Sequence, residues 1–233
     1  MKAFVRNICR ELDRGEPLVL ATVVQSTGST PRSSGAKMAV LPGGGILGTV
    51  GGGLVEAEAV RGGLRLLDDG DGAARLDFVD MTQELAARSD MICGGGLSVL
   101  LETAGPAGSC AGAYRRLDAL LRTGRPAWLR TKLERGDGQW RAVGHELLEA
   151  APDGVFGTGP AWDCAEDRAV LTEPFIPPAP LYIFGAGHVS LFTARVAAMV
   201  GFRTVVLDDR AEYANAERFP EADEVLVLDG FED

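Results

Sequence analysis

The sequence predicts an α/β protein in two parts: an N-terminal α+β domain and, after a linker, a truncated Rossmann-type doubly wound domain. Three observations support this prediction. Over residues 1–150, apolar residues recur with the periods of strands and helices. Residues 151–180 are rich in proline, glycine and acidic residues, which indicates an extended linker with one strand near Val170. Residues 181–233 have the order strand, glycine turn, helix, strand, helix, strand, the first half of a dinucleotide-binding sheet.

Composition limits the classes of function. The chain has 233 residues, 46% of them hydrophobic, and a net charge of −10, which disfavours binding to nucleic acid. No apolar run approaches the ~20 residues of a membrane span, and the N-terminus lacks a signal-peptide core. Four cysteines lie far apart without a C-x-x-C pair, a pattern typical of reduced thiols in the cytoplasm: Cys9, Cys93, Cys110 and Cys164.

The first elements follow from apolar periodicity. Residues 2–14 have the spacing of an amphipathic helix, and residues 18–24 are an apolar, β-branched run typical of a buried strand. Residues 36–41 and 46–50 predict a hairpin across a proline–glycine turn. Residues 54–67 predict a helix that begins directly after three glycines.

The rest of the first domain is expected to continue the sheet. Residues 73–79 and 97–102 predict strands, and residues 80–90 predict a short helix or a loop that covers the site. Residues 110–121 predict an amphipathic helix. Residues 128–143 predict a hairpin through Gly-Asp-Gly.

In the second part, a strand over residues 181–184 leads into a phosphate-type turn with Gly185, Gly187 and His188. Asp208, at the end of the next strand, is expected to accept a hydrogen bond from a ribose hydroxyl, which favours NAD or another adenosine nucleotide over NADP. The alternative is a scaffold that binds no nucleotide. We interpret His188 as a hydrogen-bonding turn residue rather than a catalytic base.

A second short helix is predicted over residues 211–219, followed by a third strand over residues 224–228. The chain ends at Asp233, before the other half of such a sheet, so the sequence predicts a truncated domain.

Two glycine clusters are the candidate site. Gly51, Gly52 and Gly53 precede a helix, where free N–H groups and the helix dipole suit an anion. Cys93 stands directly before Gly94 and Gly95, and backbone N–H donors there would favour the thiolate, which suits a soft metal or sulfur transfer. The alternative for Cys93 is a small buried apolar residue.

Polar residues near these glycines are further candidates. Arg32 could bind a phosphate or carboxylate, with Ser29 adding a hydroxyl; the alternative is a surface arginine. Glu56 complements the helix dipole or serves as a functional carboxylate. The run from His145 to Glu149 resembles a zincin helix but lacks its second histidine, and two histidines in the chain argue against a histidine-built zinc site.

Several motifs in the same order resemble the XdhC/CoxI family of xanthine-dehydrogenase accessory factors. They are Gly-Ser-Thr-Pro-Arg (Gly28–Arg32), Gly-Ala-Lys-Met (Gly35–Met38), Gly-Thr-Val-Gly-Gly-Gly-x-x-Glu (Gly48–Glu56) and Met-Ile-Cys-Gly-Gly (Met91–Gly95). Tyr182–Val189 and Asp208–Ala214 are similar to the start of that family's C-terminal Rossmann domain.

The resemblance implies a maturation chaperone for molybdenum hydroxylases of the xanthine or CO dehydrogenase type. Such proteins bind molybdenum cofactor, promote its sulfuration with an L-cysteine desulfurase and help deliver it to the apoenzyme. By motif, Cys93 carries over as the cofactor thiol and metal ligand. The cofactor's phosphate and dithiolene suit backbone N–H loops, an arginine and a thiol. An NAD-dependent oxidoreductase and a non-catalytic docking module remain alternatives, and the sequence leaves a homodimer open.

Overall fold

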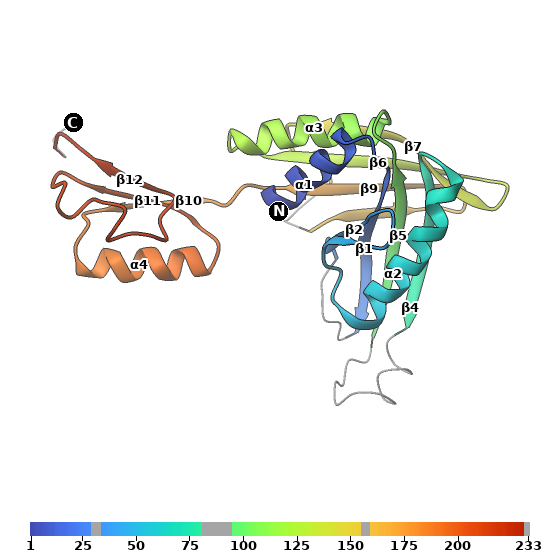
Figure 1. Cartoon of the computed structure of the whole chain (residues 1–233), viewed down its shortest axis with the longest axis horizontal. Helices are drawn as coiled ribbons and strands as arrows, with labels where there is room; N and C mark the ends of the chain where they lie inside the picture. The colour runs from blue at the N-terminus through green and yellow to red at the C-terminus, as the bar shows by residue number, and fades with distance from the viewer. Residues whose placement is uncertain (29–33, 81–94, 155–158, 231–233) are drawn as a thin grey trace. The chain divides into compact units, whose positions relative to one another are not determined.

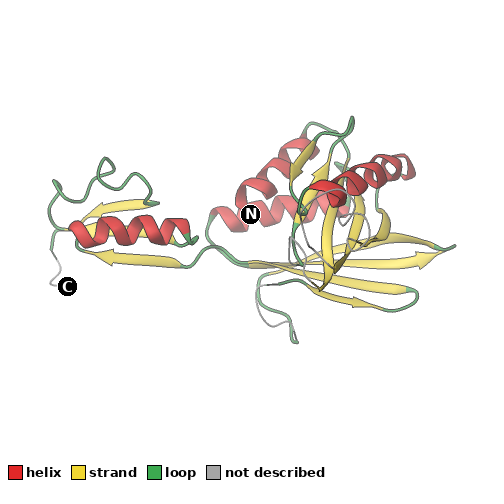
Figure 2. Ribbon diagram, turned by 90° about the horizontal axis from the view of Figure 1, so that it is seen from below, coloured by secondary structure: helices red, strands yellow, loops and turns green. Residues whose placement is uncertain are grey.

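The computed structural model describes residues 1–28, 34–80, 95–154 and 159–230, shown in Figures 1 and 2. They form two compact units, Met1–Ile176 and Pro177–Asp233. The predicted fold class is confirmed: a mixed α and β unit is followed by a Rossmann-type unit. None of the helices in these ranges combines the length and the apolar character that crossing a bilayer requires.

The first unit is built on a nine-stranded sheet in the order β3-β2-β1-β5-β4-β7-β6-β9-β8. All of its strand pairs are antiparallel. The strands are β1 (Leu18–Gly28), β2 (Lys37–Val40), β3 (Ile46–Gly48), β4 (Ala73–Asp80), β5 (Gly95–Ala104), β6 (Ala127–Gly136), β7 (Gln139–Leu148), β8 (Ala161–Cys164) and β9 (Arg168–Phe175). The helices are α1 (Lys2–Asp13), α2 (Gly53–Leu66), the short 3-10 helix η1 (Leu67–Asp69) and α3 (Ser109–Arg122).

Side-chain alternation along the strands gives the sheet two buried faces. In β1, Leu18 and Leu20 belong to the cluster that packs against α1 and α3. Val19 and Ala21 belong to the cluster that packs against α2. Because successive side chains of a strand point to opposite faces, β1 is covered on both sides, as its continuous apolar run predicts.

The sheet folds over between β4 and β7, which pair at Ala73 and Ala74 of β4. Figure 1 shows the strands β1, β5 and β4 running across the direction of β6, β7 and β9. The two halves meet in a third apolar cluster that contains Val24, Leu100 and Leu171, from β1, β5 and β9. Folding the sheet in this way brings strands from distant parts of its order into contact.

The strand predicted near Val170 is present as β9, but the stretch predicted as a linker, residues 151–180, belongs largely to the first unit, which extends to Ile176. β8 and β9 lie in this stretch, and β9 pairs with β6 from Arg168 to Phe175. β8 pairs with β9 only as far as Thr172, so no strand of the described residues pairs with that side of β9 at Pro174, and a missing N–H is tolerated there.

The second unit is a three-stranded parallel sheet in the order β10-β11-β12, with α4 on one face in Figures 1 and 2. Its elements are β10 (Pro180–Phe184), α4 (His188–Met199), β11 (Arg203–Asp208) and β12 (Glu224–Val227). Ile183, Ala194, Val206 and Phe219 form its core. This β-α-β order was predicted from the sequence.

The predicted helix over residues 211–219 is not formed; this stretch consists of turns. The Asn215 side-chain amide donates to the carbonyls of Ala211 and Glu212, and its oxygen accepts from the Arg218 N–H at 3.0 Å. A side chain that bonds to nearby backbone in this way competes with the helical pattern.

Candidate functional site

The end of β1 and the beginning of β5 lie side by side at one end of the first sheet. Gly28 pairs with Gly95, and Thr27 pairs with Gly96. The Thr27 hydroxyl lies 3.3 Å from both the nitrogen and the oxygen of Gly96, which ties the two strands together. The strand ends that flank residues 29–33 and 81–94 are therefore neighbours. Cys93, Gly94, Ser29 and Arg32 themselves lie outside the described residues.

Helix α2 begins at this same end of the sheet. A Cβ on Gly62 would lie 2.7 Å from the Leu101 side chain, and one on Gly63 would lie 3.3 Å from Val40. The C-terminal half of α2 thus lies over the part of β5 farthest from Gly95. The N-terminus of α2 therefore points toward the end of β1 and the beginning of β5, as Figure 1 shows.

The glycine triplet has left-handed backbone conformations, with φ of +129° at Gly51, +82° at Gly52 and +56° at Gly53. Glycine adopts these angles without a steric penalty. A Cβ at Gly52 or Gly53 would meet no atom within 4 Å, so the space in front of both residues is open. The triplet is therefore shaped by backbone conformation and leaves room for a ligand to approach its main chain.

Glu56 acts as an internal cap for α2. Its carboxylate accepts from the Gly52 N–H at 3.0 Å and from the Thr49 hydroxyl, and the same hydroxyl accepts from the Gly51 N–H at 3.1 Å. A carboxylate at a helix N-terminus also complements the helix dipole. Two of the donors expected for an anion are thus already used, which leaves the later N–H groups of the first turn of α2.

Phe78 is an aromatic residue at this end of the sheet that the sequence analysis missed. Its side chain is exposed, with a relative accessibility of 66%, and it lies across Gly96: a Cβ there would be 2.3 Å from the phenyl Cζ. An exposed aromatic ring on a glycine surface offers a platform for stacking. Alternation along β4 would have predicted a buried ring, because Phe78 has the same parity as Ala74 and Leu76, which pack in the third cluster.

In the second unit, Gly187 is the N-cap of α4 and Gly185 has a φ of +89°. His188, the first helical residue, is exposed, and its ring centre lies 6.2 Å from that of Phe192. Asp208 lies beside this turn but points inward. One of its oxygens accepts from the Ala186 N–H at 2.6 Å, and Arg210 binds both oxygens at 2.9 and 3.0 Å.

Those contacts determine the ionisation of Asp208. The hydrogen bonds from Arg210, and then from the Ala186 N–H, hold the pKa of the carboxyl well below its usual range. The side chain is fully buried. A ribose hydroxyl would therefore have to compete with contacts that the carboxylate already makes within the protein.

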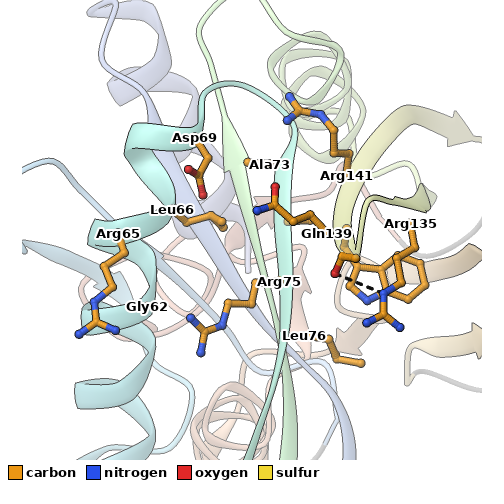
Figure 3. Close-up of a pocket in the computed structure, with 13 residues that line it drawn as sticks. Gly62, Arg65, Leu66, Asp69, Ala73, Arg75, Leu76, Arg135, Gln139 and Arg141 are labelled. Carbon is orange, nitrogen blue, oxygen red and sulfur yellow. Dashed lines mark hydrogen bonds between the residues drawn. The ribbon is translucent and has the colours of Figure 1, made fainter. Parts of the chain in front are cut away.

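A separate pocket of about 360 Å³ lies between α2, the start of β4 and the β6–β7 hairpin (Figure 3). Four arginines line it: Arg65, Arg75, Arg135 and Arg141. Three of them already have acceptors, namely the Asp77 carboxylate for Arg75, the Gly138 carbonyl for Arg135 and the Asp71 carbonyl for Arg141. In Figure 3 the guanidinium groups point in different directions, so they do not converge on one anion.

Polar residues that the sequence analysis did not single out are buried between the sheet and α3. Lys37 of β2 binds both carboxylate oxygens of Glu173 of β9 at 2.7 Å. Nearby, His145 of β7 links two residues: its Nε2 lies 2.5 Å from Glu102 Oε1, and its Nδ1 lies 2.8 Å from Ser109 Oγ. His145 lies in a strand, so the helical zincin spacing does not apply to it.

Two side chains of α3 reach the same region. Burial, together with the charge of Glu102, raises the pKa of the Cys110 thiol well above its usual value. Burial and the charge of Glu173 raise the pKa of Tyr114 in the same way. The strand parity of Leu100, Glu102 and Ala104 places the Glu102 carboxylate on the buried face of β5, a signal that alternation alone could have given.

The fold and the glycine-rich strand ends define a class: an α+β unit with a glycine triplet at the start of α2, followed by a Rossmann-type unit. Two family descriptions match, together covering about half of the chain: "XdhC and CoxI family" over residues 11–78 and "XdhC Rossmann domain" over residues 181–231. The chain belongs to the XdhC and CoxI family, which confirms the resemblance found in the sequence.

Curated relatives are longer than this chain. A protein of Bacillus subtilis described as a probable xanthine dehydrogenase subunit is 27% identical over 93% of the chain and 67% of its own length. The uncharacterized protein YqeB from Escherichia coli is 26% identical over 92% of the chain and only 26% of its own length. A crystal structure described as a xanthine dehydrogenase from Bacillus halodurans, 23% identical, covers 97% of this chain and 68% of that one with a TM-score of 0.71, which supports the fold.

Proposed function

We propose that the chain is an accessory factor that binds molybdenum cofactor and supports its sulfuration and its insertion into a molybdenum hydroxylase of the xanthine or CO dehydrogenase type. A cysteine desulfurase would supply the sulfur. Family membership and the Bacillus subtilis relative, named as part of a probable xanthine dehydrogenase, support the partner class. The observation that supports the site is that α2, which begins with the open glycine triplet, starts toward the end of the sheet where Gly28 and Gly95 pair.

The described residues at this end fit parts of the cofactor. The unblocked main chain at Gly52 and Gly53 allows a phosphate to approach the start of α2. The exposed ring of Phe78 gives a flat pterin a surface to stack on. Cys93 and Arg32 would add a thiolate for the metal and a guanidinium for the phosphate. When bound, the cofactor supplies the molybdenum and the dithiolene sulfurs, while the protein binds and orients it.

The test is to produce the chain in a host that makes molybdenum cofactor and to identify the co-purifying small molecule by mass spectrometry. We expect near 1:1 stoichiometry for the wild type and a strong loss for Cys93→Ala. Cys164→Ala is the matched control, because Cys164 is an exposed free thiol on β8 and should leave occupancy unchanged. Full occupancy of Cys93→Ala would remove Cys93 from the site.

Phe78→Ala tests the platform separately. Loss of one aromatic stacking contact costs about 1–3 kcal/mol, which makes the cofactor affinity roughly 5- to 150-fold weaker. Phe78→Tyr keeps the ring and should restore binding. Equal affinity of the wild type and Phe78→Ala would place the pterin elsewhere.

For the second unit we propose an adenosine nucleotide such as NAD at the Gly185–Gly187 turn. In this arrangement Asp208 holds the turn in place through the Ala186 N–H, and α4 provides the free N–H groups for a phosphate. Titration of the full chain with NAD, followed by amide NMR shifts, checks this. The proposal fails if NAD causes no chemical-shift changes at the amides of the Gly185–Gly187 turn.

A further inference from the structure

Three side chains of different chemistry converge beneath α3. Glu102 comes from β5, Cys110 from the first turn of α3 and His145 from β7. One ligand atom of each lies within 4.8 Å of the other two. The side chains of Glu102 and His145 are only 6% and 3% exposed. No two of these residues are closer than eight positions in sequence. It is therefore the folded sheet that brings them together.

This set of atoms suits zinc. A thiolate sulfur, an imidazole nitrogen and a carboxylate oxygen are its usual ligands, whereas magnesium and calcium prefer oxygen alone. Tetrahedral zinc with bonds of about 2.0–2.3 Å would hold its ligand atoms about 3.3–3.6 Å apart. Glu102 and His145, now 2.5 Å apart, would separate by about 1 Å, and Cys110 would approach by a similar amount.

Ser109 orients the imidazole for this role. Its hydroxyl occupies Nδ1 of His145 at 2.8 Å, which leaves Nε2 directed at Glu102. Metal-bound histidines commonly bond through their other ring nitrogen to a protein oxygen, and that bond fixes the tautomer and the ring orientation. With Nε2 on the metal, the Nδ1–H would donate to Ser109 Oγ.

The charges in this region favour a cation. Among the residues that the structure describes, Lys37 is the buried lysine, and both oxygens of Glu173 bind it. Glu102 bonds to the His145 imidazole, and no buried lysine or arginine of the described residues is bound to it. A divalent ion with one thiolate and one carboxylate is neutral overall, so it would remove the cost of that buried charge.

A fourth group is available on the same side of α3. Tyr114 follows Cys110 by one helical turn, so the two side chains share a face. Tyr114 is fully buried, and its hydroxyl has no hydrogen-bond partner within the described parts of the chain. Buried hydroxyls almost always have a partner, so this orphan oxygen is consistent with an additional ligand or a bond to a metal-bound water.

We propose that Glu102, Cys110 and His145 bind a structural zinc ion, with Tyr114 completing the site. On binding, the Cys110 thiol gives its proton to solvent, a Zn–S bond forms and no oxidation occurs. The site is distinct from the glycine-loop end, because Glu102 lies six positions along β5 from Gly96. The ion would tie α3 to two strands that belong to different halves of the folded sheet.

The experiment uses the full chain in a Cys93→Ala background, so that a thiolate in the glycine loops cannot contribute. Metal content after dialysis is measured by mass spectrometry, and the zinc is then replaced by cobalt. We expect one zinc per chain and a near-ultraviolet thiolate-to-cobalt charge-transfer band. A metal-free protein that shows no such band with cobalt overturns the proposal, whatever the molybdenum cofactor result.

Variants assign the ligands. Cys110→Ser should abolish the charge-transfer band, whereas Cys9→Ser, a buried free cysteine in α1, should keep it. Ser109→Ala should retain the band but bind zinc about 10–100-fold more weakly. A band that survives Cys110→Ser rules out this thiolate. Circular dichroism identifies variants that do not fold. If the ligand variants do not fold, the zinc content and cobalt band of the Cys93→Ala protein decide whether the site exists.

Discussion

The backbone N–H of Ala186 donates to the Asp208 carboxylate at 2.6 Å, so the glycine turn of the second unit is bound to the end of β11. The sequence pattern assigns such an aspartate to a ribose hydroxyl. Here the carboxylate stabilises the turn and is paired with Arg210. The same residue type at the same position thus has a structural partner within the fold.

Asp208→Asn tests this relationship. The amide keeps the size of the side chain but loses the charge, so the bonds from Ala186 and Arg210 weaken. We expect the amide hydrogen of Ala186 to exchange roughly tenfold faster or more at pH 7, measured by hydrogen–deuterium exchange. Asp209→Asn is the control, because Asp209 is half exposed and lies 3.6 Å from Arg210. Equal exchange in both variants would contradict the assignment.

The pH dependence has a definite sign. The folded-state pKa of Asp208 is lowered, so its stabilisation is fully present above the unfolded-state pKa of about 3.9. It is lost as the pH falls through the lower folded-state value. The difference in exchange between the wild type and Asp208→Asn should therefore be constant from neutral pH down to about pH 5 and should shrink below about pH 4.

The buried pair of Lys37 and Glu173 gives a second prediction. Lys37→Met leaves a buried carboxylate without its cation, and such a change typically lowers the free energy of unfolding by about 3–5 kcal/mol. Replacing both partners, as Lys37→Met with Glu173→Leu, should recover most of that loss. These losses of unfolding free energy are measured by urea unfolding followed by tryptophan fluorescence, since all three tryptophans lie in the first unit. Additive losses in the double variant would show that the pair is not coupled.

Gly48 and Gly43 form a matched pair for a third prediction. Both have positive φ, +75° and +86°. A Cβ on Gly48 would lie 2.6 Å from the Lys37 carbonyl oxygen, whereas a Cβ on Gly43 would meet no atom within 4 Å. Gly43→Ala should lower the free energy of unfolding by about 1–2 kcal/mol, the strain of an alanine in the left-handed conformation. Gly48→Ala should lower the free energy of unfolding by about 1–3 kcal/mol more in the same urea assay, because the Lys37 backbone cannot move away from the new Cβ. Equal losses would mean that the β2–β3 hairpin can relax.

Much of the fold follows from local pattern. The apolar spacing of residues 2–14 and 110–121 predicts α1 and α3, and the continuous run at Leu18 predicts the doubly covered strand β1. The Rossmann-type half follows from strand, turn and helix signals that are adjacent in sequence. These elements are predictable because each buries a face whose period is written in neighbouring residues.

The errors occurred where distant partners or side chains override local pattern. The sequence pattern assigns residues 151–180 to a linker with a single strand, yet β8 also forms there and both strands extend the sheet, because β9 pairs with β6 along its whole length. The predicted helix over residues 211–219 gives way to turns that Asn215 holds through its side chain. Lys37 and Glu173 are 136 positions apart, so no window of sequence shows that they meet.

The sequence by itself determined the family, the alternation of elements and the glycine-rich loops, because these depend on residues close together in the chain. Only the tertiary structure decided which strand ends adjoin, that Asp208 turns inward, and that Glu102, Cys110 and His145 share one buried space. The physical reason is that the register and folding of the sheet are set by many weak long-range contacts acting together. A local motif fixes what a residue can do, and the folded sheet fixes which partner it meets.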